Sequence, residues 1–85
     1  MKVHELKCWE THWDALADGS KTFEIRRDDR QFQKGDFLLI RKFDVSKEDY
    51  VKNVEPLIFK VTHVSTYLQK ENVVVMGIHP QACLP

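Results

Sequence analysis

The chain has 85 residues, which is room for one domain with one modest hydrophobic core. Its content of 42% apolar and 31% charged residues is typical of a folded domain and excludes a disordered one. The formal net charge is zero, but residues 21–42 carry seven basic and four acidic side chains, and the segments on either side are acidic. A basic middle in a neutral chain can bind an anion locally, whereas a general coat for polyanions is excluded.

Cysteine and histidine spacing argues against a metal or a disulfide framework. Cys8 and Cys83 are far apart, no Cys-x-x-Cys occurs, and the four histidines have no metal-ligand spacing. We therefore expect no metal and no cofactor. The first residues lack the apolar run of a signal peptide, and no segment approaches membrane-spanning length. Together with two free thiols, this favours a cytoplasmic protein without a membrane partner.

The chain begins with a strand followed by a short helix. Residues 3–8 alternate polar and apolar side chains, which predicts a half-buried strand. Thr11 is a candidate N-cap for a helix of about two turns, with Trp13 and Leu16 on its apolar stripe. Gly19 then stands where a helix often stops in a left-handed conformation. Such a short helix is unstable alone, so we expect it to pack on the rest of the domain.

Four further strands are predicted, at residues 21–27, 37–43, 57–64 and 72–78. In the first of them, Phe23 and Ile25 should face the core, with Glu24 and Arg26 on the opposite face. In the last, consecutive valines at 73–75 indicate burial on both sides.

The remaining segments are interpreted as loops or ends. Residues 44–55 are charged and lack a clear period, so we expect a loop or lid with a helical turn around 46–50. Pro80 should end the last strand, which leaves one domain over residues 1–79 and a C-terminal tail over 80–85.

The order of elements, one strand, one helix and four strands with short connections, predicts a mixed α/β fold that is mainly β. A small apolar sheet must protect its edges, and closure is the usual solution. We expect a small β-barrel of about five strands with one short N-terminal helix against it.

Two histidines share a face with apolar residues. His4 lies on the same strand face as Leu6, and His63 on the same face as Phe59 and Val61. We expect both rings to be partly buried and hydrogen-bonded rather than catalytic.

The motif Gly19-x-Lys21-x-x-Glu24-x-Arg26 resembles the signature of the ASCH domain of the PUA-like superfamily. The flanking residues are similar to a short bacterial and phage branch of that family with no assigned function. The similar stretches are His4-x-Leu6-Lys7, Lys21-Thr22-Phe23-Glu24-Ile25-Arg26, Asp28-Asp29-Arg30-x-Phe32 and Gly35-Asp36. The resemblance covers the first half of the chain closely and the second half only in the order of strands.

The resemblance implies a PUA-like barrel with a cleft between helix and sheet, in which Lys21, Glu24 and Arg26 gather and RNA or a nucleotide binds. The residue types agree, because Arg26 and Arg30 can fork onto phosphate and Lys21 can add a point charge. Glu24 can accept hydrogen bonds from a base amino group. Gly19 allows close approach of a backbone, and Trp9 or Phe32 can stack on a base if exposed.

Three alternatives stay open. The first is an enzyme that acts on RNA or a modified nucleoside. Some relatives resemble amidohydrolases that deacetylate a modified cytidine, and others are proposed to be ribonucleases. Glu24 stands where the amidohydrolases have their proposed threonine nucleophile, so we do not expect that activity here. For a ribonuclease, Lys21 and Glu24 are the candidate acid and base. A second alternative is a regulatory module that binds a protein partner through residues 44–55. The third is that Glu24 and Arg26 form only a structural ion pair under the helix.

Overall fold

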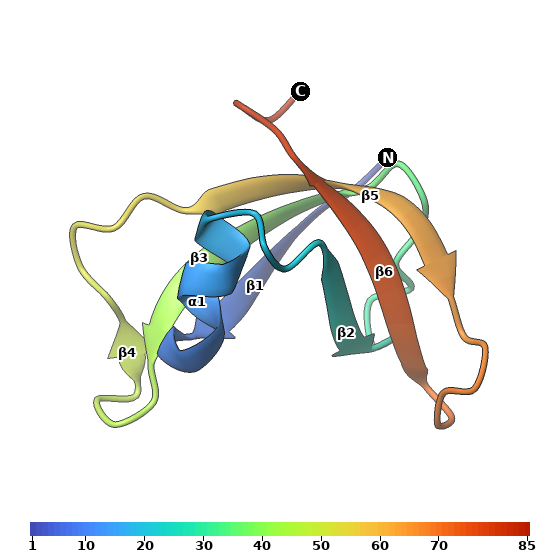
Figure 1. Ribbon diagram of the computed structural model, residues 1–85, viewed down its shortest axis with the longest axis horizontal. Coiled ribbons are helices and arrows are strands. Elements are labelled where there is room, and N and C mark those ends of the chain that lie inside the picture. The colour runs from blue at the N-terminus through green and yellow to red at the C-terminus, as the bar shows by residue number, and fades with distance from the viewer.

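The computed structural model describes all 85 residues and is mainly β (Figure 1). Its elements in chain order are β1 (Val3–Trp9), α1 (Glu10–Ala17), β2 (Phe23–Arg27), β3 (Phe37–Asp44), β4 (Asp49–Tyr50), β5 (Leu57–Ser65) and β6 (Val73–Pro80). The single helix is too short to cross a membrane. The predicted strands therefore all exist, and β4 is an addition.

One curved sheet carries the fold, with the strand order β1-β3-β5-β6-β2 and the short β4 beside β3. The β1–β3 pair is parallel and the other pairs are antiparallel. The curvature brings the two end strands, β1 and β2, toward each other around an opening (Figure 1). The predicted fold class is confirmed as a five-stranded half-barrel with one short helix.

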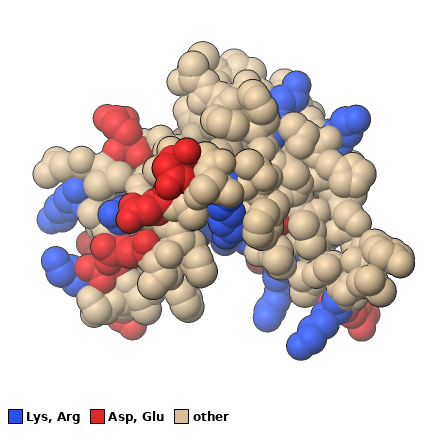
Figure 2. Space-filling model, viewed as in Figure 1, with Lys and Arg blue, Asp and Glu red and all other residues tan.

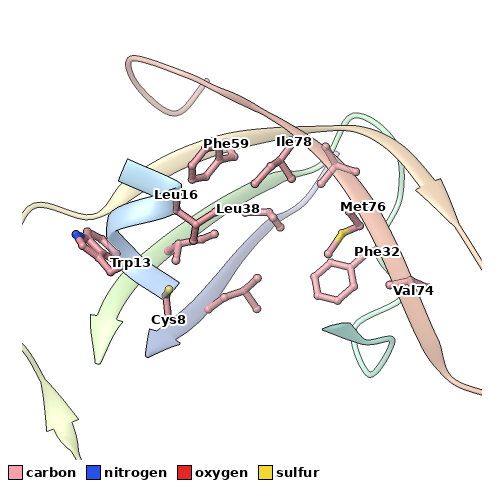
Figure 3. Close-up of a cluster of buried hydrophobic side chains, with 12 residues drawn as sticks. Cys8, Trp13, Leu16, Phe32, Leu38, Phe59, Val74, Met76 and Ile78 are labelled. Atoms are coloured by element: carbon pink, nitrogen blue, oxygen red, sulfur yellow. The ribbon is translucent and has the colours of Figure 1, made fainter. Parts of the chain in front are cut away.

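Side chains from the helix and the concave sheet face form a single core (Figure 3). The helix contributes Trp13 and Leu16, which are 6% and 2% exposed and pack over β1 and β3. Phe32 lies beside Met76 and Val74 at the other end of the core (Figure 3). This ring is 4% exposed, so it is a core residue and has no surface on which a base could stack.

The helix stops as predicted but begins earlier. The backbone of Gly19 has a φ of +84°, which favours glycine and lets the chain leave the helix toward β2. The predicted cap Thr11 lies inside the helix, because β1 runs directly into α1 and Trp9 is the N-cap. Trp9 has an extended backbone and makes no side-chain capping hydrogen bond. The helix therefore begins directly at the end of β1 without a side-chain cap.

The predicted orientation of β2 is wrong. Glu24 is 4% exposed, whereas Phe23 and Ile25 are 43% and 54% exposed. The cause is the register with β6, in which Glu24 pairs with Met76, and residues that pair across strands share a face. Because the inward face of β6 carries the core residue Met76, Glu24 must also point inward.

His4 is buried and hydrogen-bonded as predicted, but His63 is exposed. A register irregularity in the β5–β6 pairing, between Val61 and His63, breaks the alternation that the prediction assumed.

Three predictions about individual segments are also wrong. No helical turn forms at residues 46–50. Asp44 instead pairs with Asp49, and Phe43 with Tyr50, in a hairpin. The last strand continues through Pro80, which pairs with Phe59 and so belongs to the sheet rather than to a tail. Of the three valines at 73–75, only the central one is buried.

Candidate functional site

The opening between β1 and β2 contains a cleft of about 330 Å³, which we call the seam cleft. On the face that carries α1, the space-filling view shows a hollow with basic side chains inside it (Figure 2). Nine residues from β1, α1 and the β2 region line the cleft: Lys7, Cys8, Trp9, His12, Lys21, Phe23, Glu24, Ile25 and Arg26. The cleft thus lies where the half-barrel is not closed by strand pairing.

A buried carboxylate between two cations forms the polar part of the cleft. Arg26 Nε donates to Glu24 Oε2 at 2.8 Å, and Lys21 Nζ donates to Glu24 Oε1 at 3.4 Å. The Glu24 side chain is only 5% exposed, but those of Arg26 and Lys21 are 27% and 23% exposed. A charge so deeply buried requires such partners. The cationic side chains therefore remain accessible, while the carboxylate fixes their positions.

Arg26 also spans the opening. Its Nη2 donates to the main-chain carbonyl of Lys7 at 2.7 Å, and Arg30 Nη1 donates to the carbonyl of Glu5. Carbonyls two residues apart point to the same side of a strand, and this side of β1 has no strand partner. The two arginine side chains thus hold the free edge of β1 in place of a neighbouring strand. Two of the donors of Arg26 are committed to the protein, whereas Lys21 has only one long contact to Glu24.

Cys8 lies in the wall of the cleft as a neutral thiol. Burial, and after it the charge of Glu24, raise the pKa of Cys8 above its ordinary value despite the opposing effect of Lys21 and Arg26. Its Sγ donates to the carbonyl of Trp9 at 3.4 Å. Thiols with a raised pKa are poor nucleophiles, so Cys8 contributes shape rather than chemistry.

The rim of the cleft is aromatic. Trp9 is 56% exposed and Phe23 is 43% exposed, which leaves part of each ring open to a ligand. Lys21 Nζ lies 5.5 Å from the centroid of the Phe23 ring, within the range of a cation–π interaction. The same lysine thus contacts both the carboxylate below it and the aromatic ring at the rim.

The structure brings together four of the six residues proposed for ligand binding: Lys21, Glu24, Arg26 and Trp9. Gly19 lines a different hollow, between the end of α1 and the start of β5. Arg30 does not line the seam cleft and contacts Glu5 and Asp29 instead.

Sequence reasoning missed five residues that line the cleft: Lys7, Cys8, His12, Phe23 and Ile25. Apart from its place on the helix, nothing in the sequence around His12 indicates that this residue lines a cleft. Phe23 and Ile25 are apolar residues of a strand, and the sequence predicts them in the core because such residues are usually buried.

A second buried polar pair lies at the start of the sheet, outside the cleft. Asp36 accepts hydrogen bonds from His4 Nε2 at 2.8 Å and from the main-chain N–H groups of Lys2 and Gln33 at 3.0 Å each. Burial by itself raises the pKa of Asp36, but these hydrogen bonds outweigh it and lower the pKa below its ordinary value. Since the buried polar atoms of the pair have hydrogen-bond partners and neither residue lines the seam cleft, we assign the pair a structural role.

Comparison with known proteins places the chain in a family. A curated relative, the "Uncharacterized 12.9 kDa protein in GpA 3'region" of Escherichia phage P2, is 32% identical over 68 residues. The match covers 80% of this chain and 62% of the relative, so the chain spans less than two thirds of that protein. The family model described as "Domain of unknown function (DUF3850)" matches residues 3–78, which include every residue of the seam cleft. The chain therefore belongs to the DUF3850 family.

Proposed function

We propose that the protein is a small binding module for RNA or a nucleotide and that the seam cleft is its binding site. One observation carries the proposal: a buried carboxylate, Glu24, holds Lys21 and Arg26 at an open cleft whose rim bears the exposed ring of Trp9. Cations for phosphate and an aromatic surface for a base are the two components from which single-stranded nucleic-acid sites are built.

The charges support an anionic ligand. Lys7, Lys21 and Arg26 line the cleft with one carboxylate, so its lining is net positive in a chain whose net charge is zero. Lys21 is the cation best placed for phosphate, because it is partly exposed and its contact with Glu24 is long. Glu24 has lone pairs left for the amino group of a base, since each oxygen can accept more than one hydrogen bond.

The resemblance of Gly19-x-Lys21-x-x-Glu24-x-Arg26 to the ASCH signature supports the same proposal, because ASCH domains are generally proposed to bind RNA or nucleotides. The family to which the chain belongs adds no activity to the proposal. The enzymatic and protein-partner alternatives stay predictions, and no contact in the cleft favours either of them over binding.

The structure decides which variants test the proposal. Arg26 also bridges to β1, so its removal would mix a loss of binding with a loss of stability. Trp9→Ala and Lys21→Gln change side chains at the open rim. Tyr67→Ala and Lys70→Gln are matched controls on the exposed β5–β6 connection.

Binding of fluorescein-labelled short single-stranded RNA is measured by anisotropy over a series of salt concentrations. Trp9→Ala should weaken binding about fivefold or more, since a stacked base contributes roughly 1–3 kcal/mol. Lys21→Gln should lower the slope of log K against log salt by about 0.7, the value for one phosphate contact on a single strand. Absence of binding by the parent protein at low salt would refute the proposal. If Tyr67→Ala and Lys70→Gln lose as much affinity as Trp9→Ala and Lys21→Gln, the seam cleft is not the binding site.

A further inference from the structure

A row of three aromatic side chains crosses the outer face of β1, β3 and β4. Trp9 on β1 pairs in register with Phe43 on β3, and Phe43 pairs with Tyr50 on β4. Side chains of residues that pair across strands lie on the same face of the sheet. The three residues therefore share the face opposite the one on which Leu6 and Cys8 are buried. We call this row, with Lys7 and Arg41, the aromatic strip.

Two cations lie over the rings of the aromatic strip. Arg41 Cζ is 3.8 Å from the centroid of the Tyr50 ring, and Lys7 Nζ is 4.6 Å from that of Phe43. Phe43 and Tyr50 also meet edge to face at 5.5 Å. A guanidinium stacked on a ring presents its other flat face to solvent, where it can stack on a base or bind a phosphate.

The aromatic strip begins where the seam cleft ends, because Trp9 and Lys7 belong to both. Two carboxylates contact the strip: Glu5 lies 3.2 Å from Arg41, and Asp49 accepts a hydrogen bond from the main-chain N–H of Tyr50 at 2.7 Å. Cleft and strip together thus carry an excess of cations along one path in a chain of zero net charge. A polyanion with flat bases is the ligand that matches this alternation of charge and ring.

The dimensions agree with a few nucleotides. Adjacent strands are about 4.8 Å apart, so the three rings span roughly 10 Å. This is about three times the 3.4 Å spacing of successive stacked nucleotides. A mononucleotide that fills the cleft would leave the strip empty, whereas an oligonucleotide of about four residues could cover both.

Resting on the function proposed above, we infer that the ligand is a single-stranded nucleic acid whose chain continues from the seam cleft across the aromatic strip. Arg41 and Tyr50 bind the nucleotides that follow the one in the cleft. The cations and rings recognise phosphate and base, which RNA and DNA share. Exposed cation–π pairs of this kind also occur as simple surface packing, and binding as a function of length separates the two roles.

The experiment measures anisotropy with labelled random-sequence RNA of one, two, four and eight nucleotides, and with DNA of four and eight. We expect the affinity to rise at least tenfold from one to four nucleotides and to change little beyond. Tyr50→Ala should weaken binding of the four-nucleotide RNA about five- to thirtyfold and leave the mononucleotide unaffected. Tyr50→Phe keeps the ring and should bind within twofold of the parent. Tyr67→Ala, with a tyrosine 78% exposed outside the strip, is the matched control.

Tyr50→Ala could lower affinity merely by disrupting the short strand β4. A second pair of variants therefore tests the strip through Arg41, which lies on β3. Arg41→Gln should weaken the four-nucleotide complex, whereas Arg27→Gln, which changes an exposed arginine of β2 outside cleft and strip, should not.

The inference fails if mononucleotide and eight-nucleotide RNA bind equally well, or if Tyr50→Ala and Tyr67→Ala behave alike. In those cases the cleft still binds a nucleotide and the proposed function stands. If no nucleotide or RNA binds at all, the function itself fails. Comparison of RNA with DNA shows which of the two the strip accepts, and length-dependent binding of either supports the inference.

Discussion

Removal of the Arg26 side chain should destabilise the fold. In Arg26→Ala, the buried Glu24 loses its 2.8 Å partner and keeps only Lys21 at 3.4 Å. A hydrogen bond between charged groups contributes about 1.5–3 kcal/mol, and the bond from Arg26 to the Lys7 carbonyl about 0.5–1.5 kcal/mol. The Arg26 side chain is 27% exposed and Lys21 still offsets the charge of Glu24, so the lower end of these ranges applies. We expect a loss of about 2 kcal/mol in the free energy of unfolding.

For a domain of this size, each kcal/mol corresponds to about 4–8 °C in Tm, so Arg26→Ala should melt roughly 8–16 °C below the parent. Circular dichroism during heating and urea titration measures both quantities. Arg27→Ala, the exposed neighbour on the same strand, is the matched control and should melt within about 2 °C of the parent. If the two variants melt alike, Glu24 and Arg26 form a surface pair of little energetic consequence, and Arg26 is not needed to compensate a buried charge.

A double variant isolates the electrostatic part of this loss. Glu24→Gln removes the buried charge, so alanine at position 26 should cost less in that background than in the parent. The difference between the two costs, measured by urea unfolding, should be about 1 kcal/mol or more. Strictly additive effects would show that Arg26 acts only by bridging to the Lys7 carbonyl.

Two further predictions concern buried groups. The lowered pKa of Asp36 means that its carboxylate stabilises the fold fully above about pH 4, the ordinary pKa, and progressively less as the pH falls through the folded value. Asp36→Asn should therefore be less stable than the parent at pH 7, and the difference should shrink toward pH 3 in urea titrations; a constant difference would exclude this linkage. Cys83 is exposed and Cys8 is buried with a raised pKa, so a thiol reagent at pH 8 should label Cys83 at least tenfold faster. Two equal labelling rates in the folded protein would contradict the buried position of Cys8.

Local features of the fold could be predicted from the sequence because they depend on neighbouring residues. Alternation of side chains defined the strands, and Gly19 marked the end of the helix, where its φ of +84° meets little steric opposition. The motif from Gly19 to Arg26 also identified three charged residues that the structure brings into one cleft. These patterns repeat within a few residues, so no knowledge of the distant partner was needed.

Three details of the strands could not be predicted, and each depends on how two segments pair. His63 leaves its expected face because of an irregularity in the pairing of β5 with β6. The pairing of Tyr50 with Phe43 turns an expected helical turn into a hairpin, and the pairing of Pro80 with Phe59 extends the last strand. Strand register is a property of two segments, and the pattern within one of them does not specify it.

By itself, the sequence determined the order and approximate positions of the helix and the five long strands, and which charged side chains are close along the chain, because those properties follow from local sterics and periodicity. The tertiary structure alone decided which face of β2 is buried. Pairing with β6 turned Glu24 inward and left Phe23 and Ile25 exposed, against the usual preference of apolar side chains. The tertiary structure also joined Lys7 and Trp9 to this strand across the opening of the half-barrel. The physical reason is that the whole sheet decides which side chains are buried. An edge strand such as β2 therefore takes the orientation that pairing with its neighbour imposes.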